Sequence, residues 1–383
     1  MFNSYVLAEP DPQYHKHVAV PNHLGIGPSV LAMTIEYQNP DALRIWLPAI
    51  HTGSGTDIFV MRLAQALRRA GHEPLVQWFN HRYELMPELM RFHRKPEHID
   101  IIHANSWNAC VFCRQCVPVV ATVHHLVHDP AYAPYRSIAQ AFYHRWHVRW
   151  HEARAIEQSA AVTAVSSYVC QTVREVFGRE SVQVINNWVD TDQYRPSSEY
   201  KLPDNRRFRL LMVGNHSLRK GYDLLPAFAH ALGPSFDLRC TGGLRGNSAT
   251  LGLENLSILG HLSEQELICE YMHCDAVVSL SRYEGFGYTA LEGMACGKPF
   301  VGFRAGGLTD VVIDGVTGFL VPINDLTALV ERCMQLSNSS LMSERMGKAG
   351  RERALSAFIE RAAIEAYIAL YRKVIVQFQK PDR

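Results

Sequence analysis

The sequence predicts an α/β protein with two Rossmann-like, doubly wound domains that face each other across a cleft. Apolar strand-like runs alternate with amphipathic helical patterns, as in parallel sheets covered by helices on both faces. A polar, proline-containing stretch interrupts the alternation between residues 190 and 207, and a second strand–loop–helix unit follows it. The length of 383 residues suits two such domains. Since ligands bind these sheets beyond the carboxyl ends of the strands, we expect the function in the cleft.

The N-terminal domain is expected over residues 43–190. It begins with an apolar strand at Leu43–Ile50 and a glycine turn at His51–Thr56. The next helix ends at Gly71, and its apolar face consists of Phe59, Val60, Leu63, Ala64, Leu67 and Ala70. Further strands are expected at Ile99–Ile102, Val117–Val123, Ala161–Val165 and Val182–Ile185. Residues 1–42 form an extension whose order the sequence leaves open.

The C-terminal domain is expected over residues 208–360, after a linker at 191–207. It opens with a strand at Phe208–Val213, a loop at Gly214–Gly221 and a helix at Tyr222–Leu232. Ser263 and Glu266 form a capping-box pattern that predicts another helix start. Further strands are expected at Asp275–Leu280 and Pro299–Phe303. Segment 361–383 is predicted to be a helix that crosses back to the N-terminal domain, with a stripe of Ile364, Tyr367, Ile368, Tyr371, Val374 and Ile375.

The composition is that of a soluble globular protein, and the net charge of +1 gives no reason to expect a nucleic-acid partner. The sequence has no signal-peptide pattern and no run of about 18 uncharged apolar residues. Nine cysteines in such a chain indicate reduced thiols in a cytoplasm. Cys110, Cys113 and Cys116 are spaced like metal ligands, but the next cysteine is Cys170, so we interpret them as packing residues.

The segment Glu284–Tyr288 (EGFGY) follows a buried strand and opens a helix that is expected to end near Cys296. Its glycines allow backbone amides to approach a ligand, and a helix N-terminus offers unpaired N–H groups to an anion, which predicts a diphosphate cradle. Glu284 and Glu292 can border the same ligand, where sugar or ribose hydroxyls would satisfy their carboxylates. The alternative is a capped helix with surface glutamates.

Two further loops are predicted to face the cleft from the same domain. Gly214, Asn215, Arg219 and Lys220 lie at a strand–helix junction, where two adjacent cations can neutralise a leaving diphosphate. Gly306 and Gly307 follow another strand and suit contact with phosphate or sugar. A solvated basic loop and a plain strand–helix turn are the respective alternatives.

The N-terminal domain contributes a Gly53-Ser54-Gly55 loop after its first strand. Ile58 stands where a dinucleotide fingerprint has its third glycine, which argues against hydride transfer. His124, His125, His128 and Asp129 follow another strand, but their spacing is not that of zinc proteases, and we expect His124 to hydrogen-bond to substrate. Asp190-Thr191-Asp192 is a literal DxD in the interdomain connection, and we interpret it as a turn.

These residues together resemble the retaining GT-B glycosyltransferases of family 4 over most of residues 44–375. The most specific match is Glu284–Glu292 (EGFGYTALE), the E-x7-E of that family, followed by GMACGKPFVGFRAGG. The other matching segments are TVH at 122–124, AVSSYV at 164–169, INNWVDTDQYRP at 185–196, VGNHSLRKG at 213–221 and DGVTGFLVP at 314–322. Asn215 departs from the usual arginine and Asp310 from a frequent glutamate, which puts the leaving-group contacts in doubt more than the reaction.

The resemblance implies a nucleotide-diphosphate sugar as donor, no metal and no further cofactor. Glu284 would contact the donor sugar, Glu292 the ribose, Arg219 and Lys220 the leaving diphosphate, and His124 the transferred sugar. The complete set of expected donor-binding residues is Gly53, Gly55, Gly214, Asn215, Gly285, Phe286, Gly287, Tyr288, Glu292 and Gly307. The acceptor would be a glycan or lipid-linked glycan in polysaccharide biosynthesis, held mainly by the N-terminal domain.

The segment Tyr135–Arg154 mixes aromatic residues with arginines and histidines. As a helix it would suit an anionic membrane surface or a lipid phosphate, which predicts a cytoplasmic protein attached to the inner membrane face. The alternative is a solvated helix packed by its aromatic side. Two other functions stay open on this fold: an epimerase or phosphorylase, and a nucleotide-sugar-binding module without catalysis.

Overall fold

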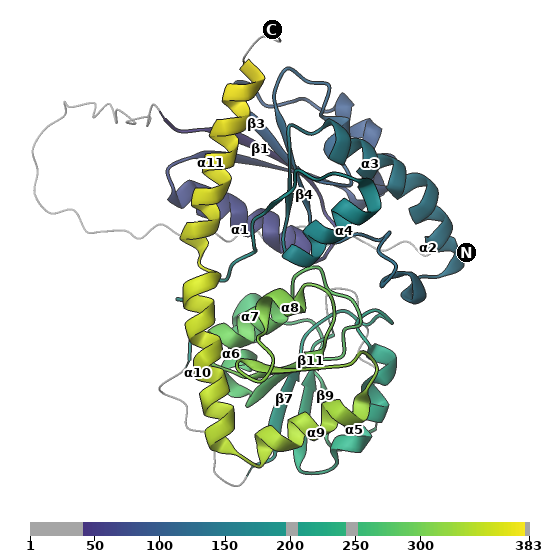
Figure 1. Ribbon diagram of the computed structural model, residues 1–383, viewed down its shortest axis with the longest axis vertical. Helices are drawn as coiled ribbons and strands as arrows, with labels where there is room; N and C mark the ends of the chain where they lie inside the picture. Colours follow the sequence, from purple (N-terminus) through teal and green to yellow (C-terminus); the bar gives the residue numbers. More distant parts are fainter. Residues whose placement is uncertain (1–40, 197–205, 243–251, 380–383) are drawn as a thin grey trace, which may run out of the picture. The chain divides into compact units, whose positions relative to one another are not determined.

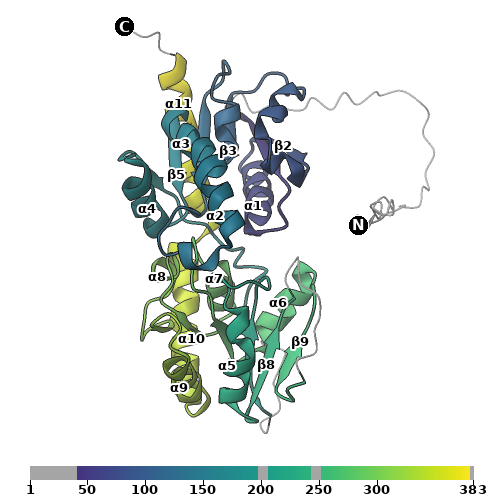
Figure 2. The ribbon, with the colours of Figure 1, turned by 90° about the vertical axis from the view of Figure 1, so that its right-hand side faces the viewer.

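The computed structural model describes residues 41–196, 206–242, 252–379 of the chain. It contains two parallel six-stranded sheets, each accompanied by helices (Figures 1 and 2). The predicted two-domain α/β fold is thus confirmed. Residues 1–40 of the predicted extension, most of the predicted linker and the last four residues lie outside the described ranges, and the exact domain boundaries stay predictions. None of the helices in the described ranges is long and apolar enough to cross a membrane.

The first sheet has the strand order β2-β1-β3-β4-β5-β6. Its strands are β1 (Arg44–Ile50), β2 (Glu73–Phe79), β3 (Ile101–Asn105), β4 (Val119–Val123), β5 (Ala161–Ala164) and β6 (Gln183–Val184). The chain moves to one side from β1 to β2 and then to the other side from β3 onward. The order therefore reverses between β1 and β3, and in doubly wound sheets such a switch point is where ligands bind.

The second sheet has the strand order β12-β11-β10-β7-β8-β9. Its strands are β7 (Phe208–Met212), β8 (Phe236–Cys240), β9 (Leu256–Ile258), β10 (Ala276–Ser279), β11 (Phe300–Phe303) and β12 (Gly318–Val321). Read from its other end, this is the 3-2-1-4-5-6 order of nucleotide-binding Rossmann folds. Its switch point lies between β7 and β10, so the loops that follow these two strands should carry the ligand groups.

Helices connect the strands in both halves. The α-helices are α1 (Gly55–Arg69), α2 (Ile138–Tyr143), α3 (Arg149–Gln158), α4 (Ser167–Phe177), α5 (Leu225–Leu232), α6 (Glu264–His273), α7 (Tyr288–Ala295), α8 (Leu308–Val311), α9 (Leu326–Ser337), α10 (Ser340–Ala357) and α11 (Glu360–Gln379). A π-helical segment, His144–Val148, joins α2 to α3. The predicted capping box of Ser263 and Glu266 is present at the start of α6.

Helix α11 carries the predicted apolar stripe, and its side chains lie in the core of the first sheet. Ile364, Tyr367 and Tyr371 pack with Phe59 and Leu63 of α1, and Figure 1 shows α11 running beside β1 and β3. The C-terminal segment therefore covers the N-terminal sheet after the chain has completed the second one.

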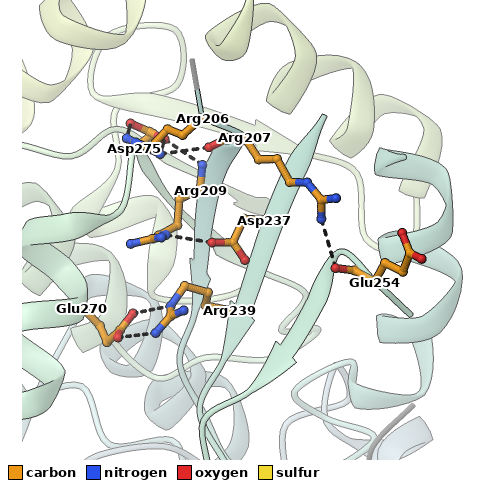
Figure 3. A network of polar contacts seen from close by, with 8 residues as sticks. All are labelled: Arg206, Arg207, Arg209, Asp237, Arg239, Glu254, Glu270 and Asp275. Atoms are coloured by element: carbon orange, nitrogen blue, oxygen red, sulfur yellow. Dashed lines mark hydrogen bonds and ion pairs between the residues drawn. The ribbon is translucent and has the colours of Figure 1, made fainter. Parts of the chain in front are cut away.

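Arginine–carboxylate pairs join strands and helices of the second sheet (Figure 3). Arg209 and Asp237 are direct cross-strand partners on β7 and β8, and their side chains are 2.8 Å apart. Asp275 receives a bidentate contact from Arg206 and a backbone hydrogen bond from Arg209. The Arg209–Asp237 pair holds the register of β7 and β8, and the Asp275 contacts join the start of β10 to that of β7, so we assign these pairs a structural role.

Candidate active site

The loops after β7 and β10 meet at the switch point of the second sheet. Lys220, from the loop after β7, forms an ion pair with Glu284, from the loop after β10, and the side chains are only 16% and 14% exposed. The guanidinium of Arg219 lies 3.9 Å from the other oxygen of Glu284. Two of the predicted cations and one predicted carboxylate therefore form one cluster at the place that the topology favours.

The electrostatics of this cluster depend on its burial. Burial raises the pKa of the Glu284 carboxyl, but the charges of Lys220 and Arg219 outweigh this effect and hold it below its ordinary value. Burial also lowers the pKa of the Lys220 ammonium, and Glu284 only partly offsets the change. A polyanion bound here would stabilise the lysine charge further, because it would replace solvation that the ammonium has lost.

A second arginine fixes the loop that carries these cations. Arg282 is buried and donates to the Leu218 carbonyl over 2.6 Å and to both oxygens of Asp223. Its own N–H donates to the Arg219 carbonyl over 2.8 Å, while the Arg219 side chain donates to the Tyr283 carbonyl over 3.0 Å. The loops after β7 and β10 are thus tied together through both backbone and side chains.

The Glu284–Gly287 loop touches the first half of the protein. A Cβ on Gly285 would lie 1.9 Å from the carbonyl oxygen of His124, so only glycine fits there. The Gly285 carbonyl accepts a 2.6 Å hydrogen bond from Ser166, the N-cap of α4. The Tyr283 hydroxyl donates to the Leu126 carbonyl over 2.9 Å and accepts from the Leu126 N–H over 3.1 Å. This contact brings the strand-end histidines next to the charged cluster.

The glycines around the start of α7 also serve close packing. Gly287 has a φ of 110° and packs against Leu308, while the Gly307 N–H donates to the Glu284 carbonyl over 2.8 Å. Phe286 is buried in the core, so only its backbone is available to a ligand. Donor binding by these residues stays a prediction. Close backbone contacts already account for Gly285 and Gly307, and the positive φ and the Leu308 side chain account for Gly287.

Glu292 lies inside α7 and is 6% exposed. One of its oxygens accepts a 2.8 Å hydrogen bond from Arg62 of α1, and the other accepts a 3.0 Å bond from Tyr271 of α6. Tyr288, one turn earlier, lies under the Arg62 guanidinium. Sequence reasoning missed Arg62, which belongs to the opposite half of the protein.

The remaining predicted donor residues lie on two loops. Gly214 follows β7, and its N–H donates to the Thr241 hydroxyl over 3.2 Å, while Asn215 lies beside it at partial exposure. Gly53 has a φ of 61°, and Asp57 holds its loop by accepting from the N–H groups of Thr52 and Gly53. Open space surrounds the position of a Cβ on Gly55, so the fold itself gives no steric reason for that glycine.

A pocket of about 40 Å³ occupies the switch point of the first sheet. Its polar lining comes from β3 and β4, the loops after β1, β3 and β4, the start of α1 and Glu84: Thr52, Thr56, Asp57, Glu84, His103, Asn105, Trp107, Asn108, Thr122 and His124. The side-chain oxygen of Asn108 is buried and has no hydrogen-bond partner within the described ranges. Sequence reasoning missed Asn105, Trp107 and Asn108, although their position at and just beyond the end of a buried strand was a usable signal.

The strand-end histidines are held neutral. Burial lowers the pKa of His124 to about 3, and its ring packs against Phe59 at a centroid distance of 4.5 Å. Burial lowers the pKa of His125 to about 4, and the charges of Arg219 and Lys220 contribute to this shift. His124 lines the pocket of the first sheet. His125, in contrast, interacts electrostatically with the Lys220–Glu284 pair.

Other predicted features have structural partners. Asp190 accepts hydrogen bonds from the N–H groups of Asp192 and Gln193, so the DxD segment forms the predicted turn. Asp129 accepts from the Tyr168 hydroxyl, and Glu152 accepts from Ser106 over 3.0 Å and lies 3.4 Å from His128. Cys110 and Cys113 pack beside the core under β3, and burial raises the pKa of Cys110 to about 12.

Two family models match consecutive parts of the chain. The model described as Glycosyltransferase Family 4 matches residues 77–193, and that described as Glycosyl transferases group 1 matches residues 196–353. The N-acetyl-alpha-D-glucosaminyl L-malate synthase of Bacillus anthracis is 28% identical over 240 residues, which cover 57% of this chain and 61% of that protein. The chain spans 55–61% of the length of the first curated relatives that it matches.

Solved structures share the fold. Sucrose-phosphate synthase from Thermosynechococcus elongatus aligns with a TM-score of 0.75 at 22% identity, over 88% of this chain and 100% of that one. Anabaena Alr3699/HepE, solved in complex with UDP-glucose, aligns with a TM-score of 0.68 at 20% identity, over 86% and 99% of the two chains. The two sheets, the E-x7-E helix and these matches lead to one conclusion: the chain belongs to the family 4 glycosyltransferases with the GT-B fold.

Proposed function

We propose that this protein transfers a sugar from a nucleotide-diphosphate sugar to a hydroxyl acceptor, with retention of the anomeric configuration. The observation that carries the proposal is the cluster of Lys220, Arg219 and Glu284 at the switch point of the second sheet. A buried carboxylate between two cations is suited to a ligand that presents hydroxyls and a diphosphate together. A nucleotide sugar is such a ligand, and Anabaena Alr3699/HepE, which shares the fold, was solved with UDP-glucose.

The two cations are suited to stabilising the leaving group. When the bond between the sugar and the diphosphate breaks, negative charge develops on the diphosphate oxygen, and preorganised donors in a shielded site stabilise it. Lys220 and Arg219 supply this charge from the protein, so we propose that transfer needs neither a metal ion nor another cofactor. Glu284, held by Lys220, would accept hydrogen bonds from the donor sugar.

We propose that the pocket of the first sheet binds the acceptor. Its lining offers amide, hydroxyl and imidazole groups and the Trp107 ring, which suit the hydroxyls and the apolar face of a sugar. A neutral His124 can hydrogen-bond to a hydroxyl without drawing the diphosphate toward the acceptor side. We therefore propose a glycan or lipid-linked glycan acceptor, as in polysaccharide biosynthesis in a cytoplasm.

Thermal unfolding with added nucleotides tests the donor class. ADP, GDP and UDP and their glucose conjugates are added separately, and a bound nucleotide should raise Tm by mass action. Incubation with the binding nucleotide sugar should then release nucleoside diphosphate, and proton NMR of the new glycoside should show the anomeric configuration of the donor. Absence of any Tm shift, or a product of inverted configuration, would contradict the proposal.

An exposed apolar stripe supports attachment to a membrane. Ile138, Phe142, Trp146 and Trp150 recur every four residues and are 91%, 69%, 64% and 47% exposed. In a regular α-helix, residues four apart drift by about 40° around the axis at each step. The π-helical turn at His144–Val148 has a wider repeat, which offsets this drift and keeps the four side chains close to one line.

A second exposed apolar group adjoins this stripe. Leu85, Met86, Leu89 and Phe92 are exposed on the two 3₁₀ turns His81–Glu84 and Pro87–Phe92 and the residue pair between them. The Glu84 carbonyl accepts from Tyr143 over 2.9 Å, which joins the two segments. Exposed Arg145 and Arg149 lie beside the aromatic residues. Such a surface fits anionic lipid headgroups, and we propose that the protein binds the inner face of a membrane there.

Liposome sedimentation tests the membrane proposal. Vesicles with about 30% anionic lipid should retain the protein at low salt, and Trp146→Ser/Trp150→Ser should weaken retention by about tenfold, because two interfacial aromatic side chains are lost. The double substitution Leu341→Ser/Leu355→Ser on α10 removes two exposed apolar side chains elsewhere and is the matched control. Equal retention of all three proteins, or none for the wild type, would refute attachment by this surface.

A further inference from the structure

Asn108 is a buried residue of the first-sheet pocket with an unused hydrogen-bond acceptor. It follows β3 shortly after the end of the strand, lines the pocket and is 1% exposed. Its Nδ2 donates to the Pro48 carbonyl over 3.3 Å, which fixes the amide, because a flipped amide would set two oxygens against each other. Oδ1 is then left buried, with no partner in the described parts of the chain. Native proteins rarely keep such an atom, so it indicates a ligand that donates a hydrogen bond.

The charged side chains of this pocket are negative. Asp57 and Glu84 line it, and among the lining residues that the structure describes there is no lysine or arginine. Its two histidines are neutral at pH 7, because burial lowers the pKa of both His103 and His124 to about 3. An anionic group that entered the pocket would meet two carboxylates and no cation to replace the water it had lost.

Asp57 also occupies the start of α1, the part of the pocket wall that would attract an anion. The N–H groups at a helix start are a common anion site. Here the Asp57 carboxylate accepts from the N–H groups of Thr52 and Gly53 at 3.1 and 2.9 Å, and from the Thr52 hydroxyl at 2.8 Å. An anionic acceptor would therefore have to compete with a carboxylate of the chain itself.

The pocket is small in comparison with a sugar. Its volume of about 40 Å³ is about three times what one ordered water molecule needs, which suits one substituent of a sugar better than a whole ring. Trp107, also in the lining, offers an aromatic ring to the sugar that carries the substituent. A hydroxyl or an ammonium group can donate to Oδ1 of Asn108, whereas a carboxylate has only acceptor oxygens.

We propose that the pocket selects acceptors whose terminal sugar places a hydroxyl or ammonium group on Oδ1 of Asn108, and that it rejects terminal sugars with a carboxylate or a phosphate. Asn108 is the specificity-determining residue, and Asp57 and Glu84 supply the negative charge that repels anions. The inference rests on the proposed function, because it takes this pocket as the acceptor site, and it adds the charge class of the acceptor.

Acceptors that differ by one charged group test this selection. p-Nitrophenyl hexosides of the gluco, galacto and manno series are compared with their uronides, 6-phosphates and 2-amino-2-deoxy forms at pH 7, with the nucleotide sugar that the enzyme hydrolyses as donor. In the series that accepts best, kcat/KM should be at least about tenfold lower for the uronide and the 6-phosphate than for the neutral hexoside. The amino form should equal or exceed the neutral one. An anionic form used as well as its neutral parent overturns the inference.

Asn108→Leu removes the acceptor oxygen and keeps the size of the side chain. It should raise KM for the neutral and amino acceptors about tenfold and leave kcat within about threefold, as expected for a lost binding contact. Asn187→Leu is the matched control, because Asn187 is 2% exposed and also has a buried Oδ1 without a partner in the described residues, but does not line the pocket. It should leave the acceptor KM unchanged. A wild-type acceptor KM in Asn108→Leu contradicts the role of Oδ1.

Glu84→Gln tests the repulsion without touching Asn108. It removes one negative charge from the lining, so the preference for the neutral hexoside over its uronide should fall by about threefold or more. Glu88→Gln is its control, since Glu88 pairs with His151 at 2.7 Å and does not line the pocket. An unchanged preference in Glu84→Gln argues against selection by charge.

The assays separate failure of this inference from failure of the proposed function. If no nucleotide sugar releases nucleoside diphosphate, the proposed function fails and the inference fails with it. If a donor is hydrolysed but its sugar reaches neither neutral nor amino hexosides, or reaches the anionic ones equally well, only the inference fails.

Discussion

The two switch points share a topology but differ in charge. At the second sheet, the loops after β7 and β10 bring together Lys220, Arg219 and Glu284, all charged and largely buried. At the first sheet, the loops after β1 and β3 line a pocket with Asn105, Trp107 and other polar groups, which include the carboxylates of Asp57 and Glu84 but, among the described residues, no lysine or arginine. Carbonyl and amide groups suit a neutral hydroxyl compound, whereas buried cations suit a diphosphate. The comparison supports our proposal that the second half binds the donor and the first half the acceptor, and it makes side-chain charge, not strand order, the basis for that division.

His124 and His125 mark the boundary between these two environments. Burial holds both imidazoles neutral, with pKa values of about 3 and 4. If either were protonated, the first switch point would carry positive charge and would compete for the diphosphate. Neutral histidines thus preserve the difference between the two sites while still offering hydrogen bonds.

Removing the Lys220 cation from the second switch point should have the largest effect on activity. Lys220→Met is expected to lower kcat/KM for the donor by about 2–4 kcal/mol of transition-state stabilisation, because the leaving diphosphate loses its nearest charge. Nucleotide release from the donor sugar measures this. Lys348→Met, an exposed lysine on α10, is the control.

The same substitution leaves Glu284 buried without its main partner, which can destabilise the fold. Lys220→Met/Glu284→Gln removes both charges, so its Tm should recover while its activity should not. Wild-type kcat/KM in either variant would show that the charged switch point is not the donor site.

Lowering the pH should destabilise the protein, because the buried His103 beside the first switch point is held neutral. His103, 4% exposed, hydrogen-bonds through its two ring nitrogens to Tyr371 and Thr122, each at 2.6 Å, and burial lowers its pKa to about 3. An unfolded histidine takes up a proton near pH 6.5, so the unfolded state binds more protons between pH 6.5 and 3. Stability is therefore complete above pH 6.5 and falls as the pH decreases.

Urea unfolding at pH 7, 6 and 5 measures this loss. Each pH unit below 6.5 should cost about 1.4 kcal/mol through His103 alone, so His103→Asn should lose about 2 kcal/mol less than the wild type between pH 7 and 5. His230→Asn, an exposed histidine on α5, is the control. Identical pH slopes for His103→Asn and the wild type would mean that the first sheet does not hold His103 neutral.

Much of this arrangement could be predicted from sequence, because local patterns determined it. Glycines and charges at strand ends located Lys220 and Glu284, and the Ser263 capping box located α6. Strands β2, β8, β9 and β12 were missed because they are short or mixed in polarity; β9 has three residues, all half-buried. The polar linker pattern predicted the division into two domains. The predicted boundaries of these domains lie partly outside the described residues.

Arg62 could not be predicted, because its significance depends on a partner 230 positions away. In the sequence it is one polar residue on an amphipathic helix and looks like part of the solvated face. Only the packing of two halves shows that it reaches a buried carboxylate. The pocket residues Asn105 and Trp107 were not predicted for a different reason. Such residues are common at the ends of strands, and these two belong to no recognisable motif.

The smallest expected effect concerns the acceptor side and tests whether the two switch points work separately. Trp107 lines the pocket and lies 6.0 Å from His125 between ring centroids. Trp107→Ala should raise the acceptor KM by about threefold to tenfold, the worth of one aromatic contact. Transfer to a panel of p-nitrophenyl glycosides measures this, and hydrolysis of the donor without acceptor should stay within about twofold of the wild type. If hydrolysis falls as far as transfer does, Trp107 serves the donor, and the two switch points do not divide the substrates by charge.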